Sequence, residues 1–120
     1  MPRNMSFALT TQQIRDRSKT VTRRFGWWFL KPGDVVNAVE KAMGLSRGER
    51  MVRLCQIRIT SVRSEPLDAI TPSDCHREGF PDFVPADFVG MITSHYGCPP
   101  DKTVNRIEFE YIEDPSQCPA

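Results

Sequence analysis

Apolar residues along much of this chain alternate with polar ones, and this period of two predicts strands. The clearest case lies near the end, where Ile107, Phe109 and Tyr111 alternate with glutamates and predict a strand over residues 104–112. Four further strands are predicted from β-branched and aromatic residues bounded by glycine, proline or polar residues. They cover residues 6–9, 20–25, 34–39 and 52–62.

The longest of these segments changes its pattern part of the way along. Val52 and Leu54 fall on one parity, whereas Ile57 and Ile59 fall on the other. A shift by one residue predicts a β-bulge or a strand that passes between two environments. The glycines at 44 and 48 predict a loop before this strand.

Helices are predicted by their start and stop signals. Thr10 or Thr11 is a suitable cap for a helix that continues to about residue 18. The run Thr71-Pro72-Ser73-Asp74 favours a second helix start, and Gly79 favours its end. A third helix is predicted over residues 85–96, with a glycine after it.

The predicted order β-α-β-β-β-α-α-β favours an α+β fold, because it lacks regular βαβ alternation. Short antiparallel strands often curl into a small barrel, so we expect a small mixed β-barrel with about three helices at its rim. We find no internal repeat or linker in the 120 residues. The sequence therefore predicts one domain, residues 1–120.

Composition excludes several classes of protein. No stretch approaches the ~20 apolar residues of a membrane helix, and the beginning shows no apolar leader, so we expect a cytoplasmic protein with no membrane partner. The four cysteines form no C-x-x-C pair, so we expect no metal site. A P-loop, a dinucleotide fingerprint and a zinc deaminase pattern are absent too, and we expect no cofactor.

Charge is distributed unevenly along the chain. Residues 1–64 hold 13 Lys+Arg against 4 Asp+Glu, whereas residues 65–120 hold 3 against 11. A basic surface is typical of proteins that bind a polyanion. The alternative is that the two halves pack together and neutralise each other, and the sequence supports both alternatives equally.

The densest polar cluster lies in residues 18–24. If this segment is extended, Thr20, Thr22 and Arg24 share one face, and Lys19 at the preceding turn can reach over it. Such a group can hold a phosphate or carbonyl oxygen. It can also pair a hydroxyl nucleophile with an uncharged lysine as base. The plainer alternative is a solvated edge strand, since lysines commonly protect exposed edges.

Two tryptophans follow this cluster directly. Trp27 and Trp28 come just after Arg23 and Arg24, and aromatic rings beside cations are typical of sites that stack unpaired bases. The alternative is that a tryptophan plugs the end of the barrel. We favour this packing role for one of the two and leave the other open.

Short motifs resemble the ASCH family, relatives of the PUA-like RNA-binding domains. The family's K-T-x-T-x-R element is similar to residues 19–24, and its G-D-x-[VL] strand is similar to residues 33–36. Its L-x-x-[LI]-T helix entry is similar to residues 67–71, and its closing strand to residues 107–109. The resemblance covers most of the chain and implies a compact β-barrel with a cleft near the K-T-x-T-x-R element.

The resemblance also implies a set of functional residues. Some small bacterial members are amidohydrolases that deacetylate N4-acetylcytidine with a lysine, a threonine and a glutamate, which fall here on Lys19, Thr22 and Glu78. The family's arginine falls on Arg24. This sequence departs from the pattern in having Ser18 where a glycine often precedes the element, and in its aromatic insertion over residues 26–29.

Three functions are therefore expected as alternatives. The first is binding of single-stranded RNA or a modified nucleoside, with Thr20, Arg23, Arg24, Trp27 and Trp28 as contacts. The second is hydrolysis of N4-acetylcytidine by Lys19, Thr22 and Glu78. The third is ribonuclease activity, which the breadth of the family alone implies.

Overall fold

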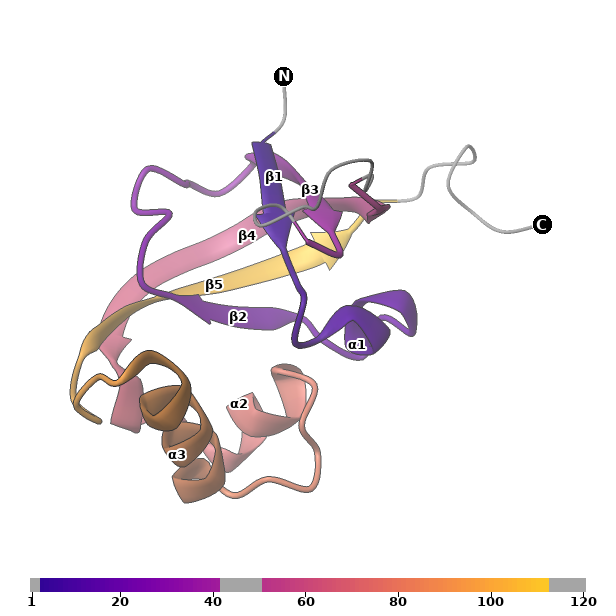
Figure 1. Cartoon of the computed structure of the whole chain (residues 1–120). Helices are drawn as coiled ribbons and strands as arrows, with labels where there is room; N and C mark the ends of the chain where they lie inside the picture. The colour runs from indigo at the N-terminus through magenta and orange to yellow at the C-terminus, as the bar shows by residue number, and fades with distance from the viewer. Residues whose placement is uncertain (1–2, 42–50, 113–120) are drawn as a thin grey trace.

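The computed structural model describes residues 3–41 and 51–112, and its strands and helices follow the predicted order (Figure 1). The loop predicted around residues 44–48 lies outside the described residues. A short 3-10 turn, η1, adds to the predicted elements. The elements are β1 (Arg3–Ser6), α1 (Thr11–Arg15), β2 (Val21–Arg24), β3 (Val35–Val39), β4 (Arg53–Pro66), η1 (Leu67–Ala69), α2 (Pro72–Arg77), α3 (Pro85–Tyr96) and β5 (Thr103–Tyr111).

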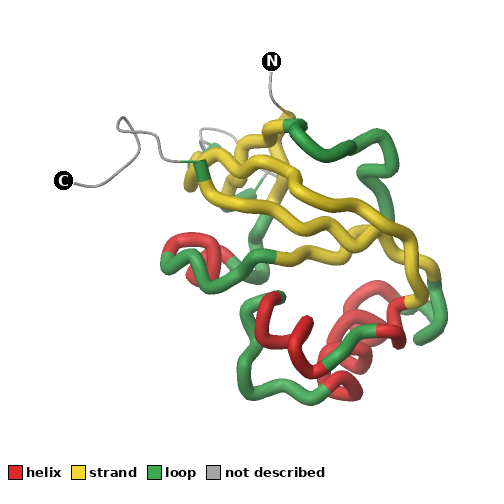
Figure 2. The backbone as a smooth tube through the Cα atoms, turned by 180° about the vertical axis from the view of Figure 1, so that it is seen from behind, coloured by secondary structure: helices red, strands yellow, loops and turns green. Residues whose placement is uncertain are grey.

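The five strands form one mixed sheet in the order β1-β3-β4-β5-β2. β1 runs parallel to β3, and the other neighbours are antiparallel. The sheet curls into a half-barrel, with β1 and β2 as its two edges (Figure 2). The predicted α+β class is confirmed, but a closed barrel is not shown. A side chain connects the two edges, because Arg24 Nη2 donates a hydrogen bond to the Ser6 carbonyl at 2.6 Å.

The irregularity predicted between Leu54 and Ile57 lies beside a register shift in β4. Ala38 of β3 pairs with Cys55, whereas Val39 pairs with Arg53, so Leu54 is an extra residue. A second register shift follows in the pairing of β4 with β5. Ile59 pairs with Phe109 of β5, whereas the next paired residue, Ser61, faces Glu108. Thr60 is therefore the extra residue. A bulge bends a strand and increases its twist, so β4 can extend from the inside of the half-barrel to the region where α2 and α3 pack.

Two apolar cores stabilise this arrangement. The first fills the inside of the curled sheet, and the second lies where η1, α2 and α3 meet the start of β5. Members of the first include Met5, Phe7, Ile14, Val36, Ile57, Ile59, Ile107 and Phe109. Members of the second are Leu67, Ile70, Cys75, Phe88 and Val104. Figure 1 shows α2 and α3 side by side below the sheet, which places residues of α2 near β2.

Three predicted elements have boundaries that were wrong by three residues or more. The long strand continues to Pro66 rather than ending at Val62, because it still pairs with Val104 and Thr103 of β5. The first strand spans residues 3–6 rather than 6–9, because the chain turns at Leu9 and leaves that side chain exposed. The first helix ends at Arg15 rather than near residue 18, because Arg17 adopts a left-handed conformation with φ of 62°. No helix in the described ranges is long and apolar enough to cross a membrane.

Candidate functional site

Lys19 lies in the connection between α1 and β2, and its backbone is held from several sides. Tyr111 Oη of β5 donates a hydrogen bond to the Lys19 carbonyl at 2.5 Å. The Lys19 amide donates to the Gln13 carbonyl at 3.3 Å, and the next amide, of Thr20, donates to the Arg77 carbonyl at 2.7 Å. These contacts fix the direction of the lysine side chain, which points inward and is only 3% exposed.

The Lys19 ammonium is paired with Glu78, 59 residues further along the chain. Nζ lies 2.5 Å from Glu78 Oε1 and 2.9 Å from the Glu78 carbonyl oxygen. Burial lowers the pKa of Lys19, with Arg24 and Arg23 acting in the same direction, while the charge and hydrogen bond of Glu78 oppose the shift. The lysine therefore loses its proton more easily than a surface lysine does.

Glu78 is positioned by the end of α2. The helix ends as predicted at Gly79, whose φ of 97° is one that residues with side chains rarely adopt. Thr71 caps the other end by accepting a hydrogen bond from the Asp74 amide, which confirms the predicted helix start. The second oxygen of the Glu78 carboxylate accepts from Arg23 Nη1 at 3.1 Å. Both oxygens of Glu78 therefore have cationic partners.

We expect Gly79→Ala to lower the free energy of unfolding by about 1–3 kcal/mol more than Gly33→Ala does. Both glycines have φ near 97°, so both substitutions strain the backbone. A Cβ at position 79 would lie 2.6 Å from Gln13 Cγ, whereas one at position 33 meets no described atom within 4 Å. Urea denaturation of the two variants measures the difference. Equal losses in the free energy of unfolding would show that the close packing of Gln13 against Gly79 adds nothing to the cost of the substitution.

Thr22 and Arg24 form the second half of the site. Thr22 is buried in the middle of β2, and its Oγ1 accepts a hydrogen bond from Arg24 Nε at 3.1 Å. The guanidinium of Arg24 also lies over the Phe7 ring, 4.7 Å from its centroid. The described contacts thus join Lys19 to Glu78 and Thr22 to Arg24, and they do not join Lys19 to Thr22.

Both pairs line one hollow, which we call the main cavity, with a volume of about 340 Å³. This volume is at the lower end of the range of small-molecule sites. Its polar end holds Lys19, Thr22, Arg23, Arg24 and Glu78. The rest of its lining is mostly apolar and aromatic, and includes Phe7, Leu9, Phe80, Phe88, Met91, Ile92 and Tyr96, together with His95. A flat ring with one polar edge matches this mixture of polar and apolar side chains.

The other predicted site residues lie in different surroundings. Thr20 Oγ1 accepts a hydrogen bond from Arg77 Nε at 3.2 Å. The Arg23 side chain is 1% exposed and contacts three carboxylates. Trp27 packs partly buried against the first core, and Trp28 is 55% exposed. Both tryptophans lie in the loop after β2 and outside the main cavity.

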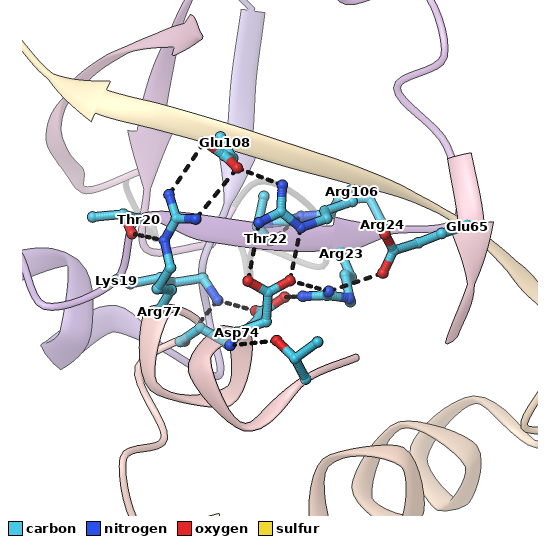
Figure 3. A network of polar contacts seen from close by, with 12 residues as sticks. Lys19, Thr20, Thr22, Arg23, Arg24, Glu65, Asp74, Arg77, Arg106 and Glu108 are labelled. Atoms are coloured by element: carbon cyan, nitrogen blue, oxygen red, sulfur yellow. Dashed lines mark hydrogen bonds and ion pairs between the residues drawn. The ribbon is translucent and has the colours of Figure 1, made fainter. Parts of the chain in front are cut away.

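An ion-pair network supports the polar end of the main cavity, and sequence reasoning missed its centre (Figure 3). Asp74 accepts from Arg23 Nη2 at 2.5 Å and from Arg106 Nε and Nη2 at 2.7 and 2.9 Å. The hydrogen bonds from Arg106, then those from Arg23, hold the pKa of Asp74 well below its usual range. Glu65 and Glu108 complete the network, at 3.0 Å from Arg23 and 2.6 Å from Arg106.

The network also bears on the uneven charge of the two halves. Lys19 and Arg23 come from the basic half, and their partners Glu65, Asp74 and Glu78 come from the acidic half. These pairs show that the halves neutralise each other at this site, as one of the two alternatives predicted. No local spacing signals such contacts, because their members are 42 to 59 residues apart.

Comparisons with known proteins show the fold and no more. No family model matches the chain, and no curated protein matches it. Among solved structures it is similar to the crystal structure of protein EF3133 from Enterococcus faecalis V583, described with the family model DUF984. The TM-score is 0.62 and the identity is 19%, over 93% of this chain and 77% of that one. The resemblance to the ASCH family therefore stays a prediction.

Proposed function

We propose that this chain is an ASCH-like protein with a PUA-like barrel, whose main cavity binds a modified pyrimidine nucleoside and hydrolyses the amide of N4-acetylcytidine. One observation carries the proposal: a buried lysine with a lowered pKa contacts a glutamate in a cavity that also holds a threonine hydroxyl. Amide hydrolysis needs a base, a nucleophile and an acid for the leaving amine. Lys19, Thr22 and Glu78 have the side chains for these three roles.

The first half of the reaction acylates the threonine. Neutral Lys19 removes the proton of Thr22 Oγ1, which attacks the carbonyl carbon of the acetyl group. The proton passes over the short contact from Lys19 Nζ to Glu78 Oε1. Glu78 donates it to the N4 amine as the C–N bond breaks, and cytidine leaves. Arg24 stabilises the negative oxygen of the tetrahedral intermediate, because its guanidinium already contacts Thr22 Oγ1.

The second half restores the enzyme with water. Lys19 takes a proton from a water molecule, the hydroxide attacks the acetyl ester, and the proton returns to Thr22 Oγ1 as acetic acid leaves. The sum is one amide and one water consumed, with one cytidine and one acetic acid produced. Phe80 and Phe88 line the same cavity and would help to exclude water from the reacting groups, and electrostatic stabilisation is strongest where water is excluded.

We expect the purified protein to release cytidine and acetate in equal amounts from N4-acetylcytidine, as chromatography would show. Thr22→Ser keeps a hydroxyl and retains measurable activity, whereas Thr22→Ala loses on the order of 10³-fold or more in kcat/KM. Full activity in Thr22→Ala would identify an activated water as the nucleophile. No cytidine release from the parent protein would reject the hydrolytic proposal for this substrate.

The second candidate is a binding module without catalysis. It is favoured by the finding that Lys19 Nζ contacts Glu78 rather than Thr22, so the described geometry has no preformed hydrogen bond between base and nucleophile. Saturable binding of N4-acetylcytidine without hydrolysis, measured by calorimetry, would support this candidate. Ribonuclease activity has no structural observation in its favour and stays a prediction from the family resemblance.

A further inference from the structure

The aromatic loop, residues 26–29, is held in one conformation by a buried side chain of the sheet. Asn105 of β5 is 3% exposed, and its Nδ2 donates hydrogen bonds to the carbonyls of Gly26 and Trp27 at 3.3 and 3.0 Å. Trp27 has a φ of 62°, which is rare for a bulky residue. Strained residues of this kind persist where the surroundings fix them, and they cluster at functional sites.

The fixed loop displays aromatic rings beside a second hollow. We call it the aromatic hollow; it has a volume of about 690 Å³, and Trp27 and Phe29 line it with ring centroids 5.5 Å apart. Phe29 is 56% exposed, and the guanidinium of Arg3 lies over its ring at 4.6 Å from the centroid. Aromatic and guanidinium planes of this kind are the surfaces on which proteins stack unpaired bases.

Arg24 connects the aromatic hollow to the main cavity, because it lines both. Among the described residues it makes no ion pair with a carboxylate, unlike its neighbours Lys19 and Arg23. Its described hydrogen bonds go to a hydroxyl and a carbonyl, so the charge of Glu78 acts on it only from a distance. An anionic group between the two hollows therefore gains a favourable electrostatic contact.

We propose that the aromatic hollow is a second subsite, which stacks the nucleobase next to the one held in the main cavity. The natural substrate is then a modified nucleotide within single-stranded RNA rather than a free nucleoside. Trp27, Phe29 and Arg3 hold the neighbouring base, and the phosphodiester between the two bases lies near Arg24. This proposal relies on the proposed function only for the identity of the nucleoside in the main cavity.

The two tryptophans of the chain both lie in this loop, so intrinsic fluorescence reports on the hollow directly. In a Trp28→Phe background, which leaves Trp27 as the single tryptophan, a short oligocytidylate should quench the emission in a saturable way. Adding Phe29→Ala should weaken that binding about tenfold, within the effect of about 1–3 kcal/mol known for loss of a base–aromatic stack. Val84→Ala removes another exposed apolar side chain, outside both hollows, and should leave binding unchanged.

A second arm separates this proposal from the proposed function. We expect kcat/KM for a trinucleotide with central N4-acetylcytidine to exceed that for the free nucleoside about tenfold, and Phe29→Ala to remove most of this advantage. Hydrolysis of both substrates at equal rates, without fluorescence quenching, would overturn the second subsite and leave the proposed function standing. Phe29-dependent RNA binding without hydrolysis would support the subsite and reject the hydrolytic function.

Discussion

Replacing Lys19 by methionine should lower kcat/KM for N4-acetylcytidine by on the order of 10³-fold or more, because the base of both half-reactions is lost. Methionine has a similar length and suits a side chain that is almost completely buried. The remaining carboxylate of Glu78 keeps its contact with Arg23 Nη1 at 3.1 Å, so it is not left without a cation. Initial rates of cytidine release measure the effect.

The pH dependence of kcat/KM for the parent protein should also identify Lys19 as the base. Only neutral Lys19 can accept a proton, so kcat/KM should rise with pH and level off above the pKa of this lysine. Burial lowers that pKa, so the midpoint of the rise should lie below about 10.4, the value for an exposed lysine. Glu78 raises the pKa of Lys19, and the residual activity of Glu78→Gln should therefore rise at lower pH than in the parent.

The matched control is Lys31→Met, which makes the same change at an exposed lysine and should leave the rate and the pH profile unchanged. Full activity in Lys19→Met, or a profile that rises only near the ordinary pKa of lysine, would refute the assigned base. A loss of activity that accompanies unfolding is recognised from the circular dichroism spectrum of the variant.

The fold was predictable where the pattern is local. Alternation of Ile107, Phe109 and Tyr111 marks β5, and the change of parity between Leu54 and Ile57 marks a strand with one register shift at Leu54 and a second at Thr60. The helix starts and stops are equally local, since a capping hydroxyl and a glycine act within one turn. Whether such a sheet closes into a barrel or remains a half-barrel depends on strand curvature over the whole sheet, which no local pattern encodes.

The candidate site was predictable only in part. The K-T-x-T-x-R element pointed to Lys19 and Thr22, and the structure places Glu78 against Lys19, as the family resemblance implied. The surroundings of Arg23 were not predictable, because its three carboxylate partners come from β4 and from α2 with the residue after it. The left-handed Trp27 was also unpredictable, since it depends on Asn105 from a strand 78 residues away.

Asp74→Ala should be the most destabilising of the single substitutions considered, with a loss of about 3–5 kcal/mol in the free energy of unfolding. The Asp74 carboxylate accepts three hydrogen bonds from Arg23 and Arg106, whose side chains are buried. Removing one member of a buried ion network leaves charge without compensation, and this costs far more than the loss of a surface pair. Arg23 Nε already lacks a hydrogen-bond partner among the described residues, so Asp74→Ala would leave this guanidinium with a further donor unsatisfied.

The pH dependence of stability has a definite sign for the same residue. Because the pKa of Asp74 is depressed in the folded protein, its contribution is fully present above the ordinary value of 3.8 and is lost as the pH falls below it. Urea denaturation at pH 7 and at pH 3 should therefore show a smaller difference between parent and Asp74→Ala at the lower pH. Glu110→Ala is the matched control, because it breaks an exposed pair with Arg58 at 3.0 Å and should cost no more than about 1 kcal/mol. If Asp74→Ala costs no more than Glu110→Ala at pH 7, the network does not stabilise the fold, and its arginines must tolerate the loss of their shared carboxylate.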